Sequence, residues 1–345
     1  MRSLPRAVSR ILSVAALAGA LALGARPAEA QVAVGGVVYG QYLFRSSDSL
    51  HLNGFDVTRA YVNATGRFAG GVGFRVTSDI YRVADSSLAL RLKYAYATWS
   101  PEHSPLTFKM GLIHTPFVDW EEALWNYRMQ GPVAVDRNRY MTSADFGGGV
   151  DGTFDHERFN FQAGAYNGEG YAGGLGDRYK DVEVRASYRV LATSDGSRVG
   201  GLRVTGYAGI GAPSAGGRRN RFLGMLSYRS NDVTAVAEYA ATEDSATAPA
   251  AALRKGRLVS TYAVLHVPNT RFSVLGRLDL VDPNTASTAS TDRLTRTIVG
   301  VAYQVSPNLR LLADVDHLGY QSGYTPTAAQ KAAQTSLLFQ FMATF

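Results

Sequence analysis

Basic side chains recur at alternate positions along several apolar stretches of this chain. Residues two apart in a β-strand lie on the same face, because successive side chains point to opposite faces. A row of fixed positive charge along a water-filled passage lowers the barrier for anions. The alternative is an ordinary polar wall stabilised by cross-strand ion pairs. Seven basic residues are candidates for an anion path: Arg75, Arg91, Lys93, Lys109, Arg128, Arg137 and Arg139.

Catalytic and metal-binding chemistry has little support in the sequence. The chain contains no cysteine, and its six histidines are scattered without the spacing of a metal site. Residues 168–173 read GEGYAG and fit a dinucleotide-binding fingerprint, but no βαβ pattern surrounds them. We therefore expect neither an enzyme nor a bound metal or cofactor.

Alternating apolar residues predict the β-strands that carry the basic candidates. In Val72–Tyr81, Phe74 and Val76 alternate with Arg75 and Thr77, which predicts one apolar and one polar face. About sixteen such stretches follow one another along the chain, with no helix long and apolar enough to span a bilayer.

The stretch Leu88–Trp99 holds two of the candidates. Simple alternation places Arg91 and Lys93 on one face, and the leucines together with Tyr94 and Tyr96 on the other. We therefore expect Arg91 and Lys93 to face water and both tyrosines to face away from it.

The last eleven residues, Thr335–Phe345, read TSLLFQFMATF. One face of this stretch is fully apolar, with Leu337, Phe339 and Phe341 among its residues, and the chain ends on an aromatic residue. Such an ending is typical of the final strand of a closed barrel whose outer face contacts lipid. The last strand of a soluble sandwich is the alternative.

The connections between the predicted strands decide between these alternatives. Short turns such as Ala69–Gly71 and Ser230–Asp232 alternate with long polar loops such as Glu243–Arg257 and Gln321–Gln334. This alternation predicts an all-β protein, a transmembrane antiparallel β-barrel of about 16 strands. The third long loop, His114–Asp145, is rich in aromatic residues, so we expect it to fold into the lumen against the inner wall.

The first thirty residues have the pattern of a secretory signal peptide. An arginine-containing start precedes an apolar run and the sequence Ala28-Glu29-Ala30, after which cleavage is expected. Residues 31–345 are then one barrel domain. Residues 1–30 hold four arginines and one glutamate, so the remainder carries +4 of the total +7. This modest surplus gives no reason to expect a nucleic-acid partner.

Several segments, in this order, resemble the phosphate-selective porin O and P family. They are LKYAYATW (Leu92–Trp99), FKMGLIHTPF (Phe108–Phe117), YRMQGP (Tyr127–Pro132), SADFGGGVDGTF (Ser143–Phe154), AYNGEG (Ala165–Gly170) and GRLDLVDPN (Gly276–Asn284). The resemblance implies a sixteen-stranded trimeric outer-membrane porin whose third loop narrows the lumen. It also implies an anion channel with lysine clusters, yet no lysine lies between His114 and Asp145.

We therefore expect a porin of the bacterial outer membrane for passive diffusion of small hydrophilic solutes. A weak preference for anions is expected, with phosphate as one candidate solute. Expected partners are outer-membrane lipid and lipopolysaccharide, small anionic solutes, and two further copies in a homotrimer. The alternative function is a structural barrel or adhesin with a plugged lumen and ligand-binding surface loops.

Overall fold

The computed structural model describes residues 31–83, 86–174, 176–247, 253–285 and 291–345. The predicted signal peptide, residues 1–30, lies outside these residues. Within the described part of the chain, no helix is both long and apolar enough to cross a membrane.

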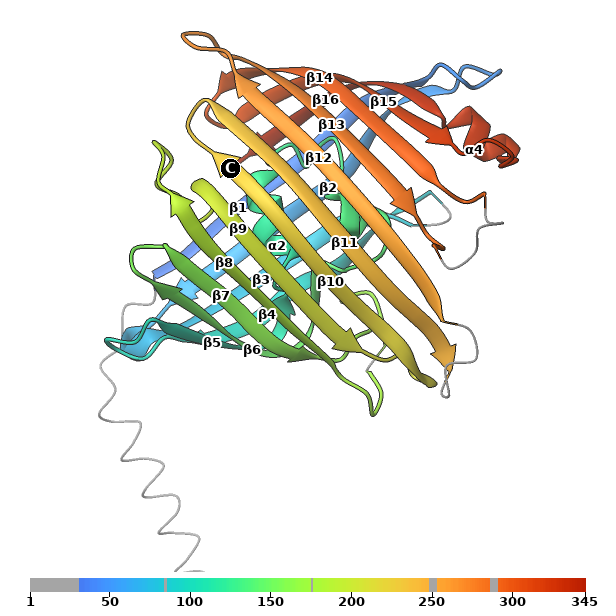
Figure 1. Ribbon diagram of the computed structural model, residues 1–345. Coiled ribbons are helices and arrows are strands. Elements are labelled where there is room, and N and C mark those ends of the chain that lie inside the picture. The colour runs from blue at the N-terminus through green and yellow to red at the C-terminus, as the bar shows by residue number, and fades with distance from the viewer. Residues whose placement is uncertain (1–30, 84–85, 175, 248–252, 286–290) are drawn as a thin grey trace, which may run out of the picture.

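Sixteen antiparallel strands form one closed barrel, as the alternation of the sequence predicted (Figure 1). Each strand pairs with its neighbours in the sequence, and β1 pairs with β16 to close the sheet. The strands are β1 (Gln31–Arg45), β2 (Asn53–Arg67), β3 (Val72–Arg82), β4 (Leu88–Trp99), β5 (Leu106–His114), β6 (Ala144–Phe154), β7 (Phe159–Tyr166), β8 (Asp181–Leu191), β9 (Gly201–Gly211), β10 (Gly216–Arg229), β11 (Val233–Thr247), β12 (Arg254–His266), β13 (Phe272–Asp282), β14 (Leu294–Ser306), β15 (Leu309–Tyr320) and β16 (Thr335–Thr344).

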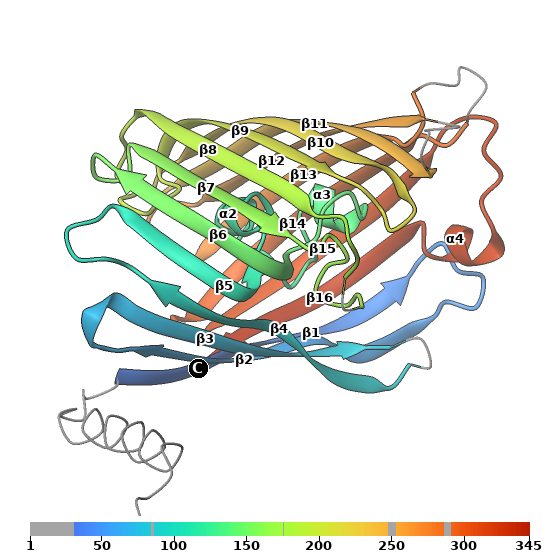
Figure 2. The same ribbon diagram turned by 90° about the horizontal axis from the view of Figure 1, so that it is seen from below.

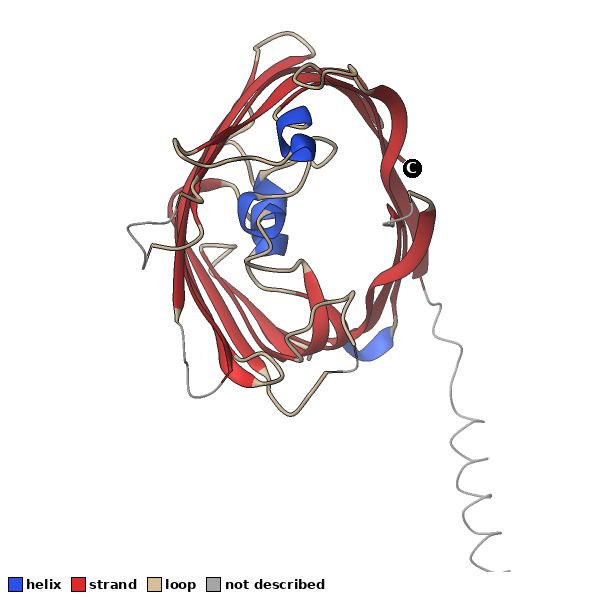
Figure 3. Cartoon of the chain, turned by 90° about the vertical axis from the view of Figure 1, so that its right-hand side faces the viewer, coloured by secondary structure: helices blue, strands red, loops and turns tan. Residues whose placement is uncertain are grey.

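Helices are confined to the connections. The short helices are η1 (Ala69–Gly71), α2 (Val118–Leu124), α3 (Ala134–Arg137) and α4 (Ala328–Ala332). Helices α2 and α3 belong to the third long loop, residues 115–143. Figure 2 shows both inside the barrel, and Figure 3 shows helical segments within the ring of strands. The predicted folding of this loop into the lumen is therefore confirmed.

The outer face of the barrel is apolar, and this confirms the assigned faces of most strands. Val76 of β3 is 41% exposed, whereas its neighbour Thr77 is 1% exposed and points inward. Phe339 of β16 is 60% exposed on the same outer face. A continuous apolar outer surface of this kind suits hydrocarbon and not water.

Barrel closure depends on close contact between β16 and β1. Gly40 is paired with Phe341, and a Cβ atom on Gly40 would lie 2.2 Å from the Phe341 ring. Only glycine leaves room for that ring. The aromatic residues of the last strand therefore pack directly on the backbone of the first.

Strand β4 departs from the predicted alternation at Lys93. Thr77 pairs with Tyr94 and Ser78 pairs with Leu92, so Lys93 is the extra residue of a β-bulge. A bulge of one residue reverses the faces of the residues beyond it. Tyr94 therefore faces inward and is 4% exposed, and the prediction that Tyr94 and Tyr96 face outward was wrong.

The strands β10, β11 and β12 are longer than the sequence suggested. The predicted long loop Glu243–Arg257 is largely strand, because β11 continues to Thr247 and β12 begins at Arg254. Polar cross-strand pairs, such as Arg218 with Glu243, stabilise this extension beyond the apolar band.

Candidate functional site in the barrel lumen

The third long loop is bound to the inner wall through its main chain. Arginines of β8, β10, β13 and β15 donate hydrogen bonds to its carbonyl oxygens. Hydrogen bonds from charged donors each contribute about 1.5–3 kcal/mol. Five loop carbonyls are bound in this way: Pro116 by Arg185, Ala123 by Arg229, Asn126 by Arg310, Pro132 by Arg277 and Tyr140 by Arg221.

Aromatic side chains of the loop fill the space between it and the wall. The Trp120 ring lies 4.0 Å from the guanidinium of Arg185, and Trp125 contacts Tyr262 with ring centroids 5.0 Å apart. These contacts combine apolar burial with cation–π attraction. Among the loop residues that are at most 1% exposed are Phe117, Trp120, Leu124, Trp125 and Tyr127. The expected burial of the loop aromatics against the inner wall is thus confirmed.

The wall of β2, β3 and β4 carries an excess of positive charge on its inner face. Asp79 is fully buried and accepts hydrogen bonds from Arg59 at 2.8 Å and Arg91 at 2.9 Å. Arg75 and Lys93 form no ion pair with any described residue. Basic side chains therefore outnumber the carboxylate of Asp79 along this wall.

Tyrosine rings position these cations without neutralising them. A ring face attracts a cation through its quadrupole and leaves the net charge unchanged. The shortest such contacts between residues of the wall are Arg91 over Tyr81 at 3.7 Å, Arg75 over Tyr94 at 4.5 Å and Lys93 over Tyr61 at 4.8 Å.

Two cavities lie along the same wall. The larger, about 690 Å³, is at the end of the barrel with the long loops and is lined by Arg59 and Arg91. The smaller, about 540 Å³, is at the end of the barrel where β1 begins at Gln31 and is lined by Arg67 and Arg75. Lys93 and Tyr94 lie between the two cavities along β4 and line neither of them.

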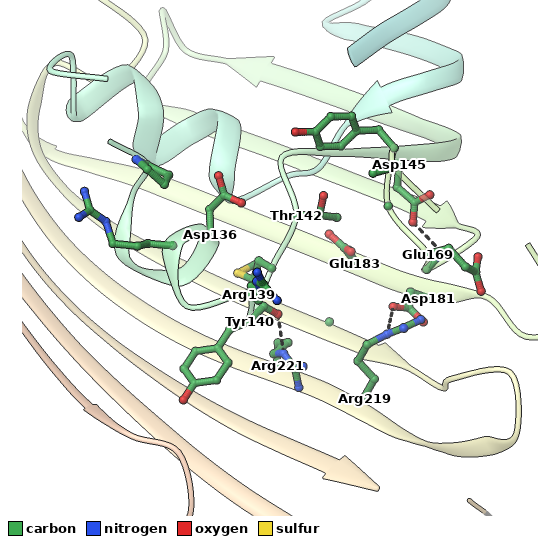
Figure 4. A pocket seen from close by; sticks show the side chains of 18 of the residues that line it. Asp136, Arg139, Tyr140, Thr142, Asp145, Glu169, Asp181, Glu183, Arg219 and Arg221 are labelled. Atoms are coloured by element: carbon green, nitrogen blue, oxygen red, sulfur yellow. Dashed lines mark hydrogen bonds and ion pairs between the residues drawn. The ribbon is translucent and has the colours of Figure 1, made fainter. Parts of the chain in front are cut away.

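The larger cavity also holds side chains of both signs (Figure 4). Arg139 is exposed there and has no ion pair among the described residues. Arg219 is paired with Asp181 at 2.9 Å, and Arg221 binds the carbonyl of Tyr140 at 2.6 Å. No group of three His, Cys, Asp or Glu side chains that could hold a metal occurs in the part of the chain that the structure describes.

The other predicted site residues are distributed around the lumen. Lys109 of β5 is 8% exposed, forms an ion pair with Asp151 and lies 2.7 Å from His114. Arg128 forms an ion pair with Glu122 inside the third loop. The structure thus places both Lys109 and Arg128 beside acidic partners.

Arg137 lines the larger cavity together with Arg59 and Arg91 of the β2–β4 wall. It binds Asp316 of β15 at 3.2 Å and Gln130 at 2.7 Å. Arg59 was not among the predicted candidates, but it lines the same cavity.

The connection between β8 and β9, residues 192–200, packs beneath the third loop. Val199 is 1% exposed and belongs to the same core as Phe117 and Trp120. Arg198 forms an ion pair with Asp119 of α2 at 2.7 Å. The local sequence of this connection gives no sign of the buried contact.

The comparisons with known proteins agree with this geometry. No family model and no curated protein matches the sequence. An anion-selective porin from Comamonas acidovorans has a similar structure, with a TM-score of 0.67 and 13% identity over 92% of this chain and 100% of that one. OmpF of Salmonella typhi, in complex with daunomycin, follows with a TM-score of 0.66 and 11% identity over 91% and 97%. The fold is that of bacterial outer-membrane porins.

A third similar structure is the trimer form of OmpT from Vibrio cholerae. Its TM-score is 0.59, with 13% identity over 92% of this chain and 99% of that one. The porin fold expected from the sequence is thus confirmed, whereas membership of the phosphate-selective family stays a prediction.

Proposed function

We propose that this protein is an outer-membrane channel for passive diffusion of small hydrophilic solutes, with a weak preference for anions. One observation carries the proposal: on the inner face of the β2–β4 wall basic side chains outnumber the single carboxylate of Asp79, and arginines of this wall line both cavities. Fixed charge along a narrow passage raises the local concentration of the opposite ion. The apolar outer face and the porin fold support a place in the outer membrane.

The anion preference originates mainly from the wall. Arg75 and Lys93 are unpaired among the described residues, whereas Lys109, Arg128 and Arg137 each have an acidic partner. Phosphate stays one candidate solute, and the absence of lysine from the third loop argues against tight phosphate block.

Reversal potentials in a planar bilayer under a salt gradient test this proposal. We expect mild anion selectivity at low salt that weakens as salt screens the wall. Changing Arg75 and Lys93 to Gln should shift the reversal potential toward cations more than changing Arg128 and Arg137 to Gln. Cation selectivity of the unchanged protein would contradict the proposal.

A plugged structural barrel is the second candidate. Between the two cavities, Lys93 and Tyr94 are each only 4% exposed and Tyr61 is 8% exposed, so little open space remains at that level. Folded protein that produces no conductance steps in the bilayer would favour this alternative.

Assembly into a homotrimer is part of the proposal. The trimer form of the similar Vibrio cholerae porin supports it. Cross-linking of detergent-extracted protein should give a species of three chains, and a monomer alone would contradict this part.

A further inference from the structure

Two buried carboxyl groups meet where helix α2 packs against the barrel wall. Glu121 of α2 is fully buried, and Glu238 of β11 is 3% exposed. The two carboxyl groups contact each other. None of their four oxygens receives a hydrogen bond from a donor in the described part of the chain.

Two ionised carboxylates could not remain in this position. An unsatisfied buried polar group costs about 1–3 kcal/mol, and more when it is charged. Like charges in contact add to that cost, so one member of such a pair keeps its proton.

The nearest cation does not relieve this cost, because it already has a partner. Arg277 of β13 donates to both oxygens of Asp279 at 2.9 and 3.1 Å, and also to the carbonyl of Pro132. The hydroxyl of Tyr262 on β12 faces the carboxyl pair and is uncharged.

The remaining charged groups around α2 have other partners: Arg185 and Arg203 lie at the Trp120 ring and donate to main-chain carbonyls. On the helix itself, Asp119 is bound to Arg198 and Glu122 to Arg128. From β10, Arg229 is bound to Asp195 at 2.6 Å. Among the described residues, none of these cations forms an ion pair with Glu121 or Glu238.

We propose that Glu121 and Glu238 share a proton, and that this shared proton attaches helix α2, and with it the third loop, to strand β11. The protonated carboxyl of one residue donates its O–H to a carboxylate oxygen of the other. The shared proton and the attachment of the loop do not depend on the proposed channel function. Only an effect of the attachment on conductance rests on that function.

The direction of the pH dependence follows from the linkage between proton binding and attachment. Burial, and then the neighbouring Glu238, raise the pKa of Glu121 well above its ordinary value of 4.5. The attached loop thus binds one proton more than the released loop, so rising pH favours release. Between the ordinary and the raised pKa, the equilibrium constant for release of the loop increases about ten-fold for each unit of pH, for one proton released. Above the raised pKa the effect levels off.

Tryptophan fluorescence tests the attachment without reference to conduction. The chain has three tryptophans, and Trp99 lies on the outer face, so Trp99→Phe leaves Trp120 and Trp125 of the third loop as reporters. We expect their emission to shift to longer wavelength as the pH rises, while the heat-modifiable barrel stays folded.

Substitutions at two adjacent positions give the matched comparison. Glu121→Gln places an amide donor where the proton would lie, so it should keep the loop attached and abolish the alkaline shift. Glu122→Gln changes the neighbouring acid, which is paired with Arg128, and should leave the shift in place. A shift that persists in Glu121→Gln would overturn the proposal.

Infrared spectroscopy tests the proton itself. Wild-type protein at neutral pH should show the C=O band of a protonated carboxyl group, and this band should weaken in both Glu121→Gln and Glu238→Gln. If the band is absent and a chelator shifts the emission, a metal ion bridges the pair and the proposal is wrong. Protein that never conducts but shows the band and the shift would refute the channel function alone.

Discussion

Asp79 sets the charge of the β2–β4 wall, because Arg59 and Arg91 both contact this carboxylate. We predict that Asp79→Asn makes the channel several-fold more selective for anions at low salt, since a pair of charges about 4 Å apart interacts by roughly 1–4 kcal/mol. The change is measured as the reversal potential in a salt gradient. Asp155→Asn, which removes an exposed carboxylate in a short turn, is the control and should shift the potential little.

Asp119 gives the third loop a sensitivity to acid. Burial alone would raise the pKa of Asp119, but His114 and Arg198 lower it below its ordinary value of 3.8. The pKa of such a carboxyl group is lower in the folded loop than in the unfolded loop. The group therefore stabilises the folded loop at pH values above its pKa in the unfolded loop. This stabilisation is lost as the pH falls through its pKa in the folded loop.

Replacing the cation should move this transition. We predict that Arg198→Gln raises the pKa of Asp119, so the loop tryptophans change their emission at higher pH in an acid titration. Arg158→Gln, in another connection at the same end of the barrel, should titrate like the wild type. An unchanged titration of Arg198→Gln would show that the ion pair does not stabilise the loop.

For single residues, the alternation of the sequence predicts which face of a strand a side chain lies on, but not its partner. The inward positions of Arg75, Arg91 and Lys93 follow from it. The pairing of Lys109 with Asp151 does not, because Lys109 lies opposite Gly149 and its partner is two residues further along β6. Such diagonal contacts depend on register, which one strand's pattern does not contain.

At the scale of the strand, the two faces of the barrel wall should respond differently to the same substitution. We predict that Val76→Arg, on the outer face of β3, costs about 2–4 kcal/mol of stability in lipid. Thr65→Arg, on the adjacent strand and beside the smaller cavity, should cost much less because its charge stays in water. Urea unfolding in phospholipid vesicles measures both, and equal losses would contradict the assigned faces.

Strand existence was predictable, but strand length and irregularity were not. The extension of β10 to β12 is polar, so it lacks the apolar period that marks a strand. The bulge at Lys93 is equally hidden, because its extra residue is determined by pairing with Thr77 and Ser78 on β3. Both features depend on a neighbouring strand, which the local sequence does not show.

At the scale of the whole barrel, closure requires the outer aromatics of β16. We predict that Phe339→Asp together with Phe341→Asp prevents membrane insertion, because two charges would enter the lipid-facing surface and the Phe341 ring would leave Gly40. Heat-modifiable migration on gels reports the folded barrel. Ser336→Asp, on the inner face of the same strand, should fold normally, and folding of the double variant would contradict the closure argument.

The overall architecture was the most predictable property of this chain. The number of strands and the alternation of short and long connections can be read from the apolar periodicity and the spacing of turns. These features do not require a particular sequence, since proteins with only 11–13% identity share the fold. The path of the third loop depends on arginines of distant strands, such as Arg221 and Arg310, whose contacts the pattern alone does not reveal.

The way in which these arginines hold the third loop has a consequence for evolution and for engineering. They bind main-chain carbonyls, which every residue possesses, so the attachment does not depend on the identity of the side chains at those positions. Mutations that exchange lumen-facing side chains such as Arg139 can therefore accumulate without loss of the loop's path. A single scaffold of this kind can diversify its permeants, and the same freedom makes it suitable as a nanopore with interchangeable sensing residues.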